Sequence, residues 1–491
     1  MILNEETIRL ILGLKIRSSR ADKGISLTEL AQQTGVSVSY LNEIEKGKKH
    51  PKPSKIALIA DALDVPYDQL VSLELDKKLL TVARLLSSEV MKELPLEHFG
   101  IDTATLVDVF STAPAKFGAF VNTLIEIARS RDISVEQFYF DALRSYQEMR
   151  ENYFGDLEQL ALQFIEDKNL NVSIDAILKQ LELILKEEYS ITVSYTLQNR
   201  PNLVQLRSLF NQQKSKLLVN KDLTPEQKAF VLAKEIGFQL MKVEARPHTS
   251  VWVKAESFDA VLNNFRASYF AGAVLISCDQ LVEDMEGFFA MNKWSPEKIH
   301  EIISHYPASP EVFMYRLTSI LPKFFGLNQL FFLKFDHDEL LNEVHLSKEL
   351  HLSGLHNPHA SFMNEHYCNR WISIWLLNDL VEAPSEKFIS GIQRSSYVDS
   401  TNEYLLLTIA RRSEPAKGRN SSLSLGLLIN PLLIQKVKFL NDEAIKRKLV
   451  NITCERCRLE DCKERGAEPK VYIKQQQQQQ LIKAIDEYLT E

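Results

Sequence analysis

The sequence of 491 residues has few cysteines and glycines and no long uninterrupted apolar run. Five cysteines, an odd number in a chain of this length, do not indicate a disulfide framework. The 16 glycines form no phosphate-binding pattern, which argues against a nucleotide-binding loop. The most apolar stretch, 313–333, contains Arg316, Pro322 and Lys323, so it does not predict a membrane span.

The N-terminal stretch, MILNEETIRL, lacks the basic start and apolar core of a signal peptide, so we expect a cytoplasmic protein without membrane contact. The 45% apolar and 25% charged residues are typical of a globular protein, and the length predicts two or three domains. The net charge is −7, yet residues 1–56 carry ten Lys and Arg against six acids. That local positive excess suits phosphate groups.

Residues 26–51 have the pattern of two short helices joined by a tight turn. Ser26 and Ser37 can each cap a helix, because a serine hydroxyl accepts a hydrogen bond from an otherwise unpaired amide. Gly35 between them tolerates the positive φ of a turn. Gly47 and Pro51 then predict the end of the second helix.

This arrangement is the helix-turn-helix pattern, in which the second helix enters the DNA major groove. With Leu41 and Ile44 facing inward, the outer face presents polar groups and one aromatic ring that can read base edges. The lysines that follow suit phosphate oxygens. A helical hairpin within a larger bundle, with solvated lysines, is the alternative. The predicted DNA-binding residues are Gln32, Ser37, Val38, Ser39, Tyr40, Asn42, Glu43, Lys46, Lys48 and Lys49.

Residues 6–75 resemble the Cro/cI-type (XRE) DNA-binding domain. The resemblance lies in Gly35-Val36-Ser37, Tyr40-Leu41, Ile44-Glu45-Lys46-Gly47-Lys48, Pro51 and Ala60-Asp61-Ala62-Leu63. It implies five helices, with the first near 6–23, the fourth near 54–63 and the fifth from 67. It also implies an ion pair between Arg20, late in the first helix, and Glu45.

A second helix signal lies in the middle of the chain, where Thr224 and Pro225 predict the start of a helix. Its frame resembles the ImmA/IrrE peptidase helix, in which His-Glu-x-x-His binds zinc and the Glu acts as a base. Here Lys234 and Phe238 occupy the two histidine positions, and neither can bind zinc. Arg266 stands near the place of the expected acidic third ligand. We therefore expect a peptidase-shaped domain without its metal.

In the C-terminal third the residue pattern alternates between apolar and polar, which predicts strands at 328–336, 371–377, 390–398 and 404–410. Gln475–Gln480 lies among helix formers and predicts a terminal helix. The expected fold class is mainly α with an α+β C-terminal part. We expect a five-helix Cro/cI-type domain over 1–75, a helical connector over 76–114, a helical, zincin-like ImmA/IrrE domain over 115–325, and a small mixed-sheet sensor domain over 326–491.

Cys454, Cys457 and Cys462 lie within nine residues and are separated by polar residues, which predicts a metal site. A fourth ligand is needed, and we expect Cys368, with Cys278 and His366 as alternatives. By donor chemistry alone zinc is the commoner occupant and an iron–sulfur cluster the rarer one. Unligated surface thiols are the other interpretation.

Nearly the whole chain resembles the short-chain fatty acyl transcriptional regulators, which join an XRE domain, a degenerate ImmA/IrrE-like domain and a DUF2083-type C-terminal domain. The landmarks are residues 146–167, Cys368-x-x-Trp371 and Cys454-x-x-Cys457-x-x-x-x-Cys462-x-x-Arg465. The resemblance implies regulation of short-chain acyl metabolism in response to acyl-CoA, with a four-iron (4Fe–4S) cluster on the cysteines.

We accordingly expect a homodimeric, non-enzymatic transcription regulator that binds double-stranded DNA. Two other classes stay open. One is an ImmA/IrrE-type metallopeptidase regulator that cleaves a repressor, which would need zinc ligands on the middle helix. The other is a ligand-independent phage-type or antitoxin repressor, for which the chain is unusually long.

Overall fold

The computed structural model describes residues 5–72, 96–100, 135–249, 255–339, 343–352, 365–383, 385–398, 400–413 and 418–490. The chain divides into two compact units. One comprises 1–146 with 256–258, and the other comprises 147–255 with 259–491. Apart from 96–100, the predicted connector over 76–114 lies outside the described residues, as does the predicted helical segment 115–134.

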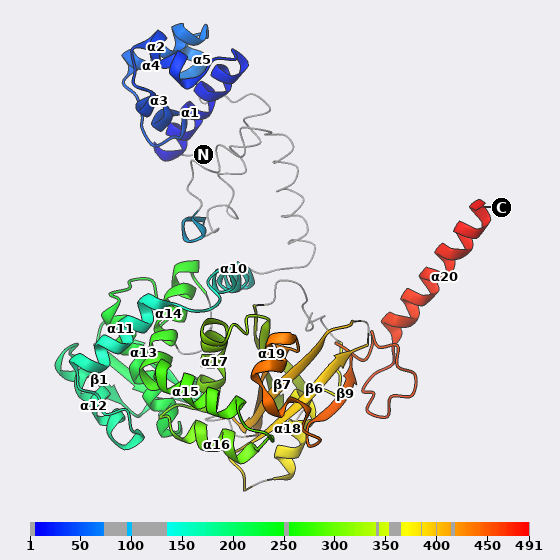
Figure 1. Cartoon of the computed structure of the whole chain (residues 1–491). Coiled ribbons are helices and arrows are strands. Elements are labelled where there is room, and N and C mark those ends of the chain that lie inside the picture. Colours follow the sequence, from blue (N-terminus) through cyan, green and yellow to red (C-terminus); the bar gives the residue numbers. More distant parts are fainter. Residues whose placement is uncertain are drawn as a thin grey trace. The chain divides into compact units, whose positions relative to one another are not determined.

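The first unit contains the five predicted helices, drawn in blue in Figure 1. Their apolar faces form one core, which includes Leu30, Leu41 and Ile44, each with no exposed surface. A short 3₁₀ helix at Leu96–Phe99 also belongs to this unit. The helices are α1 (Glu5–Asp22), α2 (Leu27–Thr34), α3 (Val38–Glu45), α4 (Pro53–Leu63) and α5 (Tyr67–Val71).

The second unit begins with helices and a small three-stranded sheet. The order in this sheet is β1-β3-β2, with β1 parallel and β2 antiparallel to β3. These strands are only three or four residues long and were not predicted from the sequence. The strands are β1 (Thr192–Ser194), β2 (Ser208–Asn211) and β3 (Lys216–Val219). The helices are α10 (Val135–Met149, which begins in the first unit), α11 (Gly155–Asp167), α12 (Ile174–Glu187), α13 (Pro225–Leu240), α14 (Phe258–Leu275), α15 (Cys278–Phe289), α16 (Pro296–Ser304) and α17 (Pro310–Phe325).

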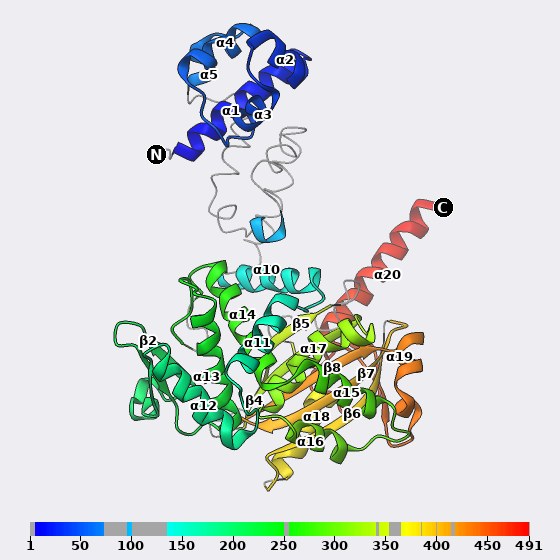
Figure 2. The ribbon, with the colours of Figure 1, turned by 60° about the vertical axis from the view of Figure 1, so that its left-hand side comes forward.

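A six-stranded sheet also belongs to this unit (Figure 2). Its strand order is β5-β4-β8-β7-β6-β9. Neighbouring strands are antiparallel except β6 and β9. The strands are β4 (Leu330–Asp338), β5 (Glu343–His351), β6 (Phe388–Tyr397), β7 (Glu403–Arg412), β8 (Arg419–Leu428) and β9 (Lys446–Val450).

Both faces of this sheet are buried, each in a different core. Along β7, Leu405 and Leu407 join the core that contains α13–α17. The alternate residues Tyr404 and Leu406 face the core around α18 (Ile372–Glu382), as the two-residue period of a strand requires. The larger core runs from Ala161 to Ile445, so helices before residue 325 and strands after it share one core.

The strands predicted at 328–336, 390–398 and 404–410 are confirmed as β4, β6 and β7. The strand predicted at 371–377 is wrong, because Trp371 caps the helix α18. This helix lies on the sheet and buries Ile372, Leu376, Leu377 and Leu380, so its sequence is apolar on almost every side. Strands β5, β8 and β9 were not predicted from the sequence.

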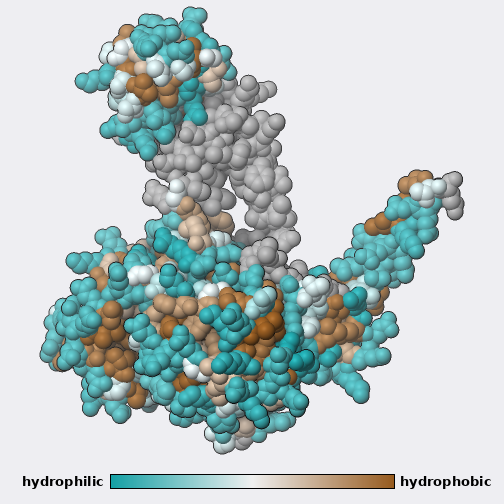
Figure 3. All heavy atoms as spheres, viewed as in Figure 1, coloured by the Kyte–Doolittle hydropathy of each residue, from teal (hydrophilic) through white to brown (hydrophobic). Residues whose placement is uncertain are grey.

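The C-terminal segment contains α19 (Pro431–Lys436), a 3₁₀ helix at Lys438–Asn441, and the predicted terminal helix α20 (Lys470–Thr490). Helix α20 buries none of its residues. Figure 3 shows apolar atoms near its end, where Leu481, Ile485 and Leu489 are exposed. None of the described helices combines the length and apolarity needed to span a bilayer.

Candidate nucleic-acid interface and cysteine pocket

The turn between α2 and α3 is built by the predicted caps. Ser26 forms a capping box with Glu29: the Glu29 amide donates to Ser26 Oγ at 3.2 Å, and the Ser26 amide donates to Glu29 Oε2 at 2.7 Å. Gly35 then takes the left-handed conformation, with φ 65°. Ser37 caps α3 by accepting from the Tyr40 amide at 3.3 Å.

Helix α3 turns Leu41 and Ile44 into the core and presents the opposite side to solvent. Val38, which exposes 42% of its surface, lies in the first turn and gives this face an apolar contact group suited to a thymine methyl. Of the predicted DNA-binding residues, Gln32, Ser37, Val38, Ser39, Lys48 and Lys49 are exposed, and Tyr40, Asn42, Glu43 and Lys46 are half-buried.

A tight backbone turn fixes the basic segment that follows α3. The amides of Lys48 and Lys49 donate to the Glu43 carbonyl at 2.9 and 3.3 Å, and Gly47 has φ 68°. One further cation lies beside this helix: Lys55 Nζ is 4.5 Å from the centre of the Tyr40 ring. Lys55 was not among the predicted DNA-binding residues, because it belongs to the next helix and only the fold brings it to α3.

The predicted ion pair between Arg20 and Glu45 is confirmed. Arg20 Nε and Nη2 donate to the two Glu45 carboxylate oxygens at 2.7 and 2.9 Å, and its Nη1 donates to the Ile25 carbonyl at 2.9 Å. The hydrogen bond to Glu45 raises the pKa of Arg20. Gly13 in α1 permits this close approach, because a Cβ there would lie 2.4 Å from the Ile44 carbonyl oxygen. The end of α3 is therefore held against α1.

Basic and aromatic side chains occupy the peptidase-like positions on α13. Lys234 and Phe238 stand where zinc-binding histidines would stand, and Lys234 Nζ lies 5.8 Å from the Phe238 ring centre. Burial, together with the positive charges of Arg246, Lys348 and Arg207, lowers the pKa of Lys234 to about 7.

Glu235, at the position of the peptidase base, is held in a buried ion pair. Arg246 donates to its two carboxylate oxygens at 2.8 and 2.6 Å, and the Glu235 side chain is 3% exposed. The Arg246 guanidinium also stacks on Phe238, 3.9 Å from the ring centre. Arg266, near the expected acidic ligand, lies 3.5 Å from Asp156.

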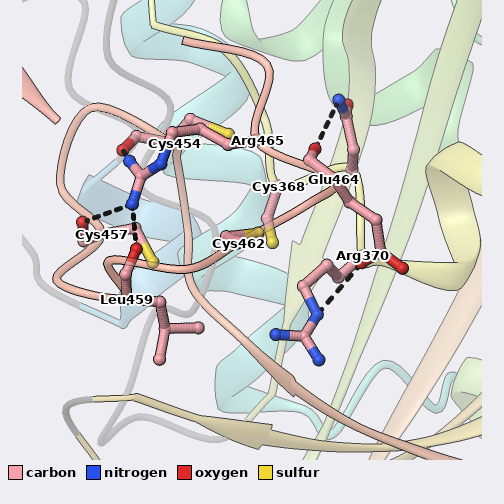
Figure 4. A pocket seen from close by; sticks show the side chains of 9 residues that line it. Cys368, Arg370, Cys454, Cys457, Leu459, Cys462, Glu464 and Arg465 are labelled. Atoms are coloured by element: carbon pink, nitrogen blue, oxygen red, sulfur yellow. Dashed lines mark hydrogen bonds and ion pairs between the residues drawn. The ribbon is translucent and has the colours of Figure 1, made fainter. Parts of the chain in front are cut away.

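The four predicted cysteine ligands line one pocket, together with Asn369, Arg370, Leu459, Glu464 and Arg465 (Figure 4). Cys368, Cys454 and Cys457 are buried and Cys462 is half-buried. Burial raises the pKa of the Cys368 thiol to about 11. Cys368, which is more than eighty residues from the others in sequence, therefore lines the same pocket.

Backbone bonds tie the two cysteine segments together. The Cys454 amide donates to the His366 carbonyl at 2.8 Å, and the Cys368 amide donates to the Ile452 carbonyl at 3.3 Å. Arg465 holds the loop that carries Cys454, Cys457 and Cys462. Its guanidinium donates to the Cys454 and Cys457 carbonyls at 3.1 and 3.4 Å, and also to the Leu459 carbonyl. Arg465 thus shapes the pocket through the backbone.

The two alternative fourth ligands do not line this pocket. His366 Nδ1 lies 2.8 Å from the buried Glu455 carboxylate, and Cys278 lies at the start of α15. As placed, no three or more His, Cys, Asp or Glu side chains within the described residues are grouped closely enough to hold a metal ion. The four thiols are nevertheless a donor set that fits zinc or an iron–sulfur cluster.

Two different parts of the chain match two different families of known proteins. A family model described as helix-turn-helix matches residues 16–70. The transcriptional regulator YazB of Bacillus subtilis is 40% identical over 60 residues, which are 12% of this chain and 87% of YazB. The chain belongs to the helix-turn-helix family of transcriptional regulators. The match lies entirely within its N-terminal part.

Two further helix-turn-helix relatives are longer. The repressor RghR of B. subtilis is 37% identical over 60 residues, which are 12% of this chain and 44% of RghR. The regulator ClgR of Mycobacterium tuberculosis is 36% identical over 59 residues, 12% of this chain and 53% of ClgR. The chain thus spans about half the length of these two relatives.

Outside the helix-turn-helix domain, a family model described as an IrrE N-terminal-like domain matches residues 188–318, which include α13. A solved structure of a Mycobacterium tuberculosis transcriptional regulator is 16% identical, with a TM-score of 0.48, and covers 67% of this chain and 93% of that one. A similarity at that level says nothing about what either chain binds.

Proposed function

We propose that this protein is a sequence-specific DNA-binding transcription regulator that places α3 in the major groove. The observation that carries the proposal is the outer face of α3, which is capped, exposed and followed by a fixed basic turn. Ser39, Tyr40 and Glu43 would read bases. Gln32, Lys46, Lys48 and Lys49 would hold phosphates, with Lys55 as an addition from α4.

A homodimer is part of this proposal. Two copies of α3 separated by one turn of the duplex, about 34 Å, would read the two halves of a near-palindromic site. The second unit would act as a sensor, with acyl-CoA as the proposed effector. An effector can regulate only if it binds the DNA-competent and DNA-incompetent states with different affinities.

We also propose that Cys368, Cys454, Cys457 and Cys462 hold a metal centre, with a four-iron cluster preferred and zinc as the alternative. What supports it is the meeting of four thiols from two distant segments in one pocket. A bound centre would supply either a structural cross-link or a redox-sensitive group. Arg465 would keep the loop carbonyls in place.

A metallopeptidase role is the competing proposal, because the second unit matches an IrrE-like domain. The side chains on α13 count against it. Lys234 and Phe238 offer no zinc ligand, and the Glu235 carboxylate is occupied by Arg246. We therefore propose that this domain senses and does not hydrolyse.

The decisive experiment selects DNA fragments from a randomised duplex pool with the full-length protein at low ionic strength. The expected result is enrichment of an inverted repeat, which Glu43→Ala relaxes at one position of each half-site. A pool that shows no enrichment, with and without acyl-CoA, would contradict the proposal. Metal and sulfide analysis of anaerobically purified protein tests the cysteine site. A zinc content equimolar with the protein, without sulfide, would assign zinc to the site in place of the cluster.

A further inference from the structure

Basic side chains from several elements of the second unit gather around the peptidase-like helix. They come from the segment before β2 (Arg207), from α13 (Lys234), from the loop after it (Arg246) and from β5 (Lys348). Strands β4 and β7 add Lys334 and Arg411, which pair with Glu311 on α17. The acids that act on this group are Glu235, Glu311 and Asp336, so cations outnumber acids.

The acids in this cluster are already engaged. Both terminal nitrogens of the Arg246 guanidinium donate to the Glu235 carboxylate. Glu311 receives Arg411 at 2.7 Å, Lys334 at 3.2 Å and Arg207 at 3.4 Å. Burial raises the pKa of Glu311, but the surrounding cations outweigh burial and hold it well below its usual range.

Two lysines are left without an acid of their own. Among the residues that the structure describes, no carboxylate lies within ion-pair distance of Lys234 or Lys348. Lys348 Nζ instead lies 3.4 Å from the centre of the Tyr315 ring, one helical turn beyond Glu311 on α17. Lys234 is half-buried, and Lys348 leaves part of its surface exposed while its ammonium group lies over the Tyr315 ring, so this side of the cluster borders solvent.

Clustered like charges disfavour their own protonated forms. Burial is the main cause of the lowered pKa of both lysines. The charges of Arg246, Lys348 and Arg207 add to it at Lys234, whose pKa falls to about 7. At Lys348 the charge of Arg207 adds to burial and Glu311 opposes it, and the pKa falls to about 8. An anion bound by both lysines would offset the positive charge that acts on Lys234 and would give each lysine a partner. A phosphate group fits better than a monovalent carboxylate, because a dianion neutralises two ammonium groups and matches a guanidinium.

We propose that Lys234 and Lys348, with Arg207 beside them, form a binding site for a phosphate or pyrophosphate group. The site uses basic side chains where the peptidase-like frame would carry a metal cation. It goes beyond DNA binding and does not depend on it, since every residue of the site belongs to the second unit. The phosphate can come from a free inorganic anion or from a larger ligand such as coenzyme A.

Calorimetric titration of the full-length protein with inorganic pyrophosphate near neutral pH tests the site. Because Lys234 is only partly protonated there, anion binding must draw in protons. The measured heat will then differ between two buffers with different ionisation enthalpies. Affinity will fall as the pH rises past the lowered lysine pKa values, where both ammonium groups lose their protons.

Three variants locate the effect. Lys234→Gln and Lys348→Gln should each weaken pyrophosphate binding about tenfold or more, equivalent to roughly 1.4 kcal/mol. Lys228→Gln is the matched control, because it removes a lysine from the same helix that lies over Tyr195, 5.5 Å from the ring centre. It should change affinity by no more than about twofold. Proton uptake should fall in Lys234→Gln.

Coenzyme A is titrated separately to identify the source of the phosphate. Tighter binding of coenzyme A than of pyrophosphate indicates a larger organic ligand, and equal binding indicates a free anion; either result supports the site. Absence of pyrophosphate binding to folded wild-type protein at low ionic strength overturns it, as does unchanged affinity in Lys234→Gln. Binding without proton uptake overturns it even if the variants fail to fold. DNA binding that persists in such a case would leave the proposed function standing.

Discussion

The Arg20–Glu45 pair gives the sharpest test of how the helix-turn-helix is held. The Glu45 side chain is 3% exposed and that of Arg20 is 16% exposed, so Arg20→Ala leaves a buried carboxylate without its partner. Loss of one partner of a buried pair costs about 3–5 kcal/mol. Because Arg20 keeps some contact with water, we expect the lower end, about 3 kcal/mol.

Hydrogen exchange read by mass spectrometry measures this in the full-length protein, because each peptide reports its own domain. A loss of about 3 kcal/mol should speed exchange of the α1 and α3 amides roughly hundredfold, with no change in the second unit. Lys23→Ala is the control, since it removes one exposed hydrogen bond, to the Ala62 carbonyl at 3.0 Å. The reasoning fails if Arg20→Ala changes exchange in α3 by less than about threefold or if Lys23→Ala matches it.

Three further predictions follow from the described side chains. Lys48→Ala should weaken binding to all DNA sequences alike and reduce the salt slope by about one, whereas Glu43→Ala should change sequence preference; anisotropy titrations over a salt series separate them. Cys457→Ser should remove the visible absorbance of anaerobically purified protein, and a colourless wild type that contains zinc would refute the cluster. Lys234→Met should raise the free energy of unfolding in phosphate-free buffer below about pH 7, where the native state must protonate a lysine of lowered pKa. That gain should shrink as the pH rises toward 10, the usual lysine range, and denaturant titrations at several pH values measure it.

The helix-turn-helix could be predicted closely because its signals are local. Ser26, Gly35 and Ser37 fix the two helices through bonds to residues within a few positions, and the structure confirms each of them. The Arg20–Glu45 pair came from the family resemblance and is also present. Gly13 carried no signal, because its role depends on the approach of α3 from another part of the chain.

The large sheet was predicted only in part, for physical reasons. The run from Trp371 to Leu377 is apolar except for Ser373, and a buried helix cannot be told from a buried strand by such a run. Strand β8 was missed because it carries serines, which look like loop residues. They are buried and bonded: Ser424 Oγ lies 2.7 Å from Ser373 Oγ and 2.8 Å from Thr408 Oγ1.

Sites made by residues that are distant in sequence differ in how far they can be predicted from the sequence. The spacing of Cys454, Cys457 and Cys462 predicted a metal site, and Cys368 was preferred over Cys278 and His366 as the fourth ligand; the four cysteines line one pocket. The basic cluster around Lys234 had no such signal. Its members are spread from Arg207 to Arg411 and lie among ordinary charged residues, so only the fold reveals it.

The loop that carries Cys454, Cys457 and Cys462 also helps to hold β9, the edge strand of the large sheet, in place. Among the described strands, β9 pairs only with β6. The chain runs from the last residue of β9, Val450, directly into the loop that Cys454 and Cys368 tie to the start of α18. Were oxidation of the thiols to loosen the loop, β9 would detach and leave the backbone of β6 unpaired. An uncovered strand of this kind readily pairs with another chain, so oxidative damage at the sulfurs should appear first as aggregation.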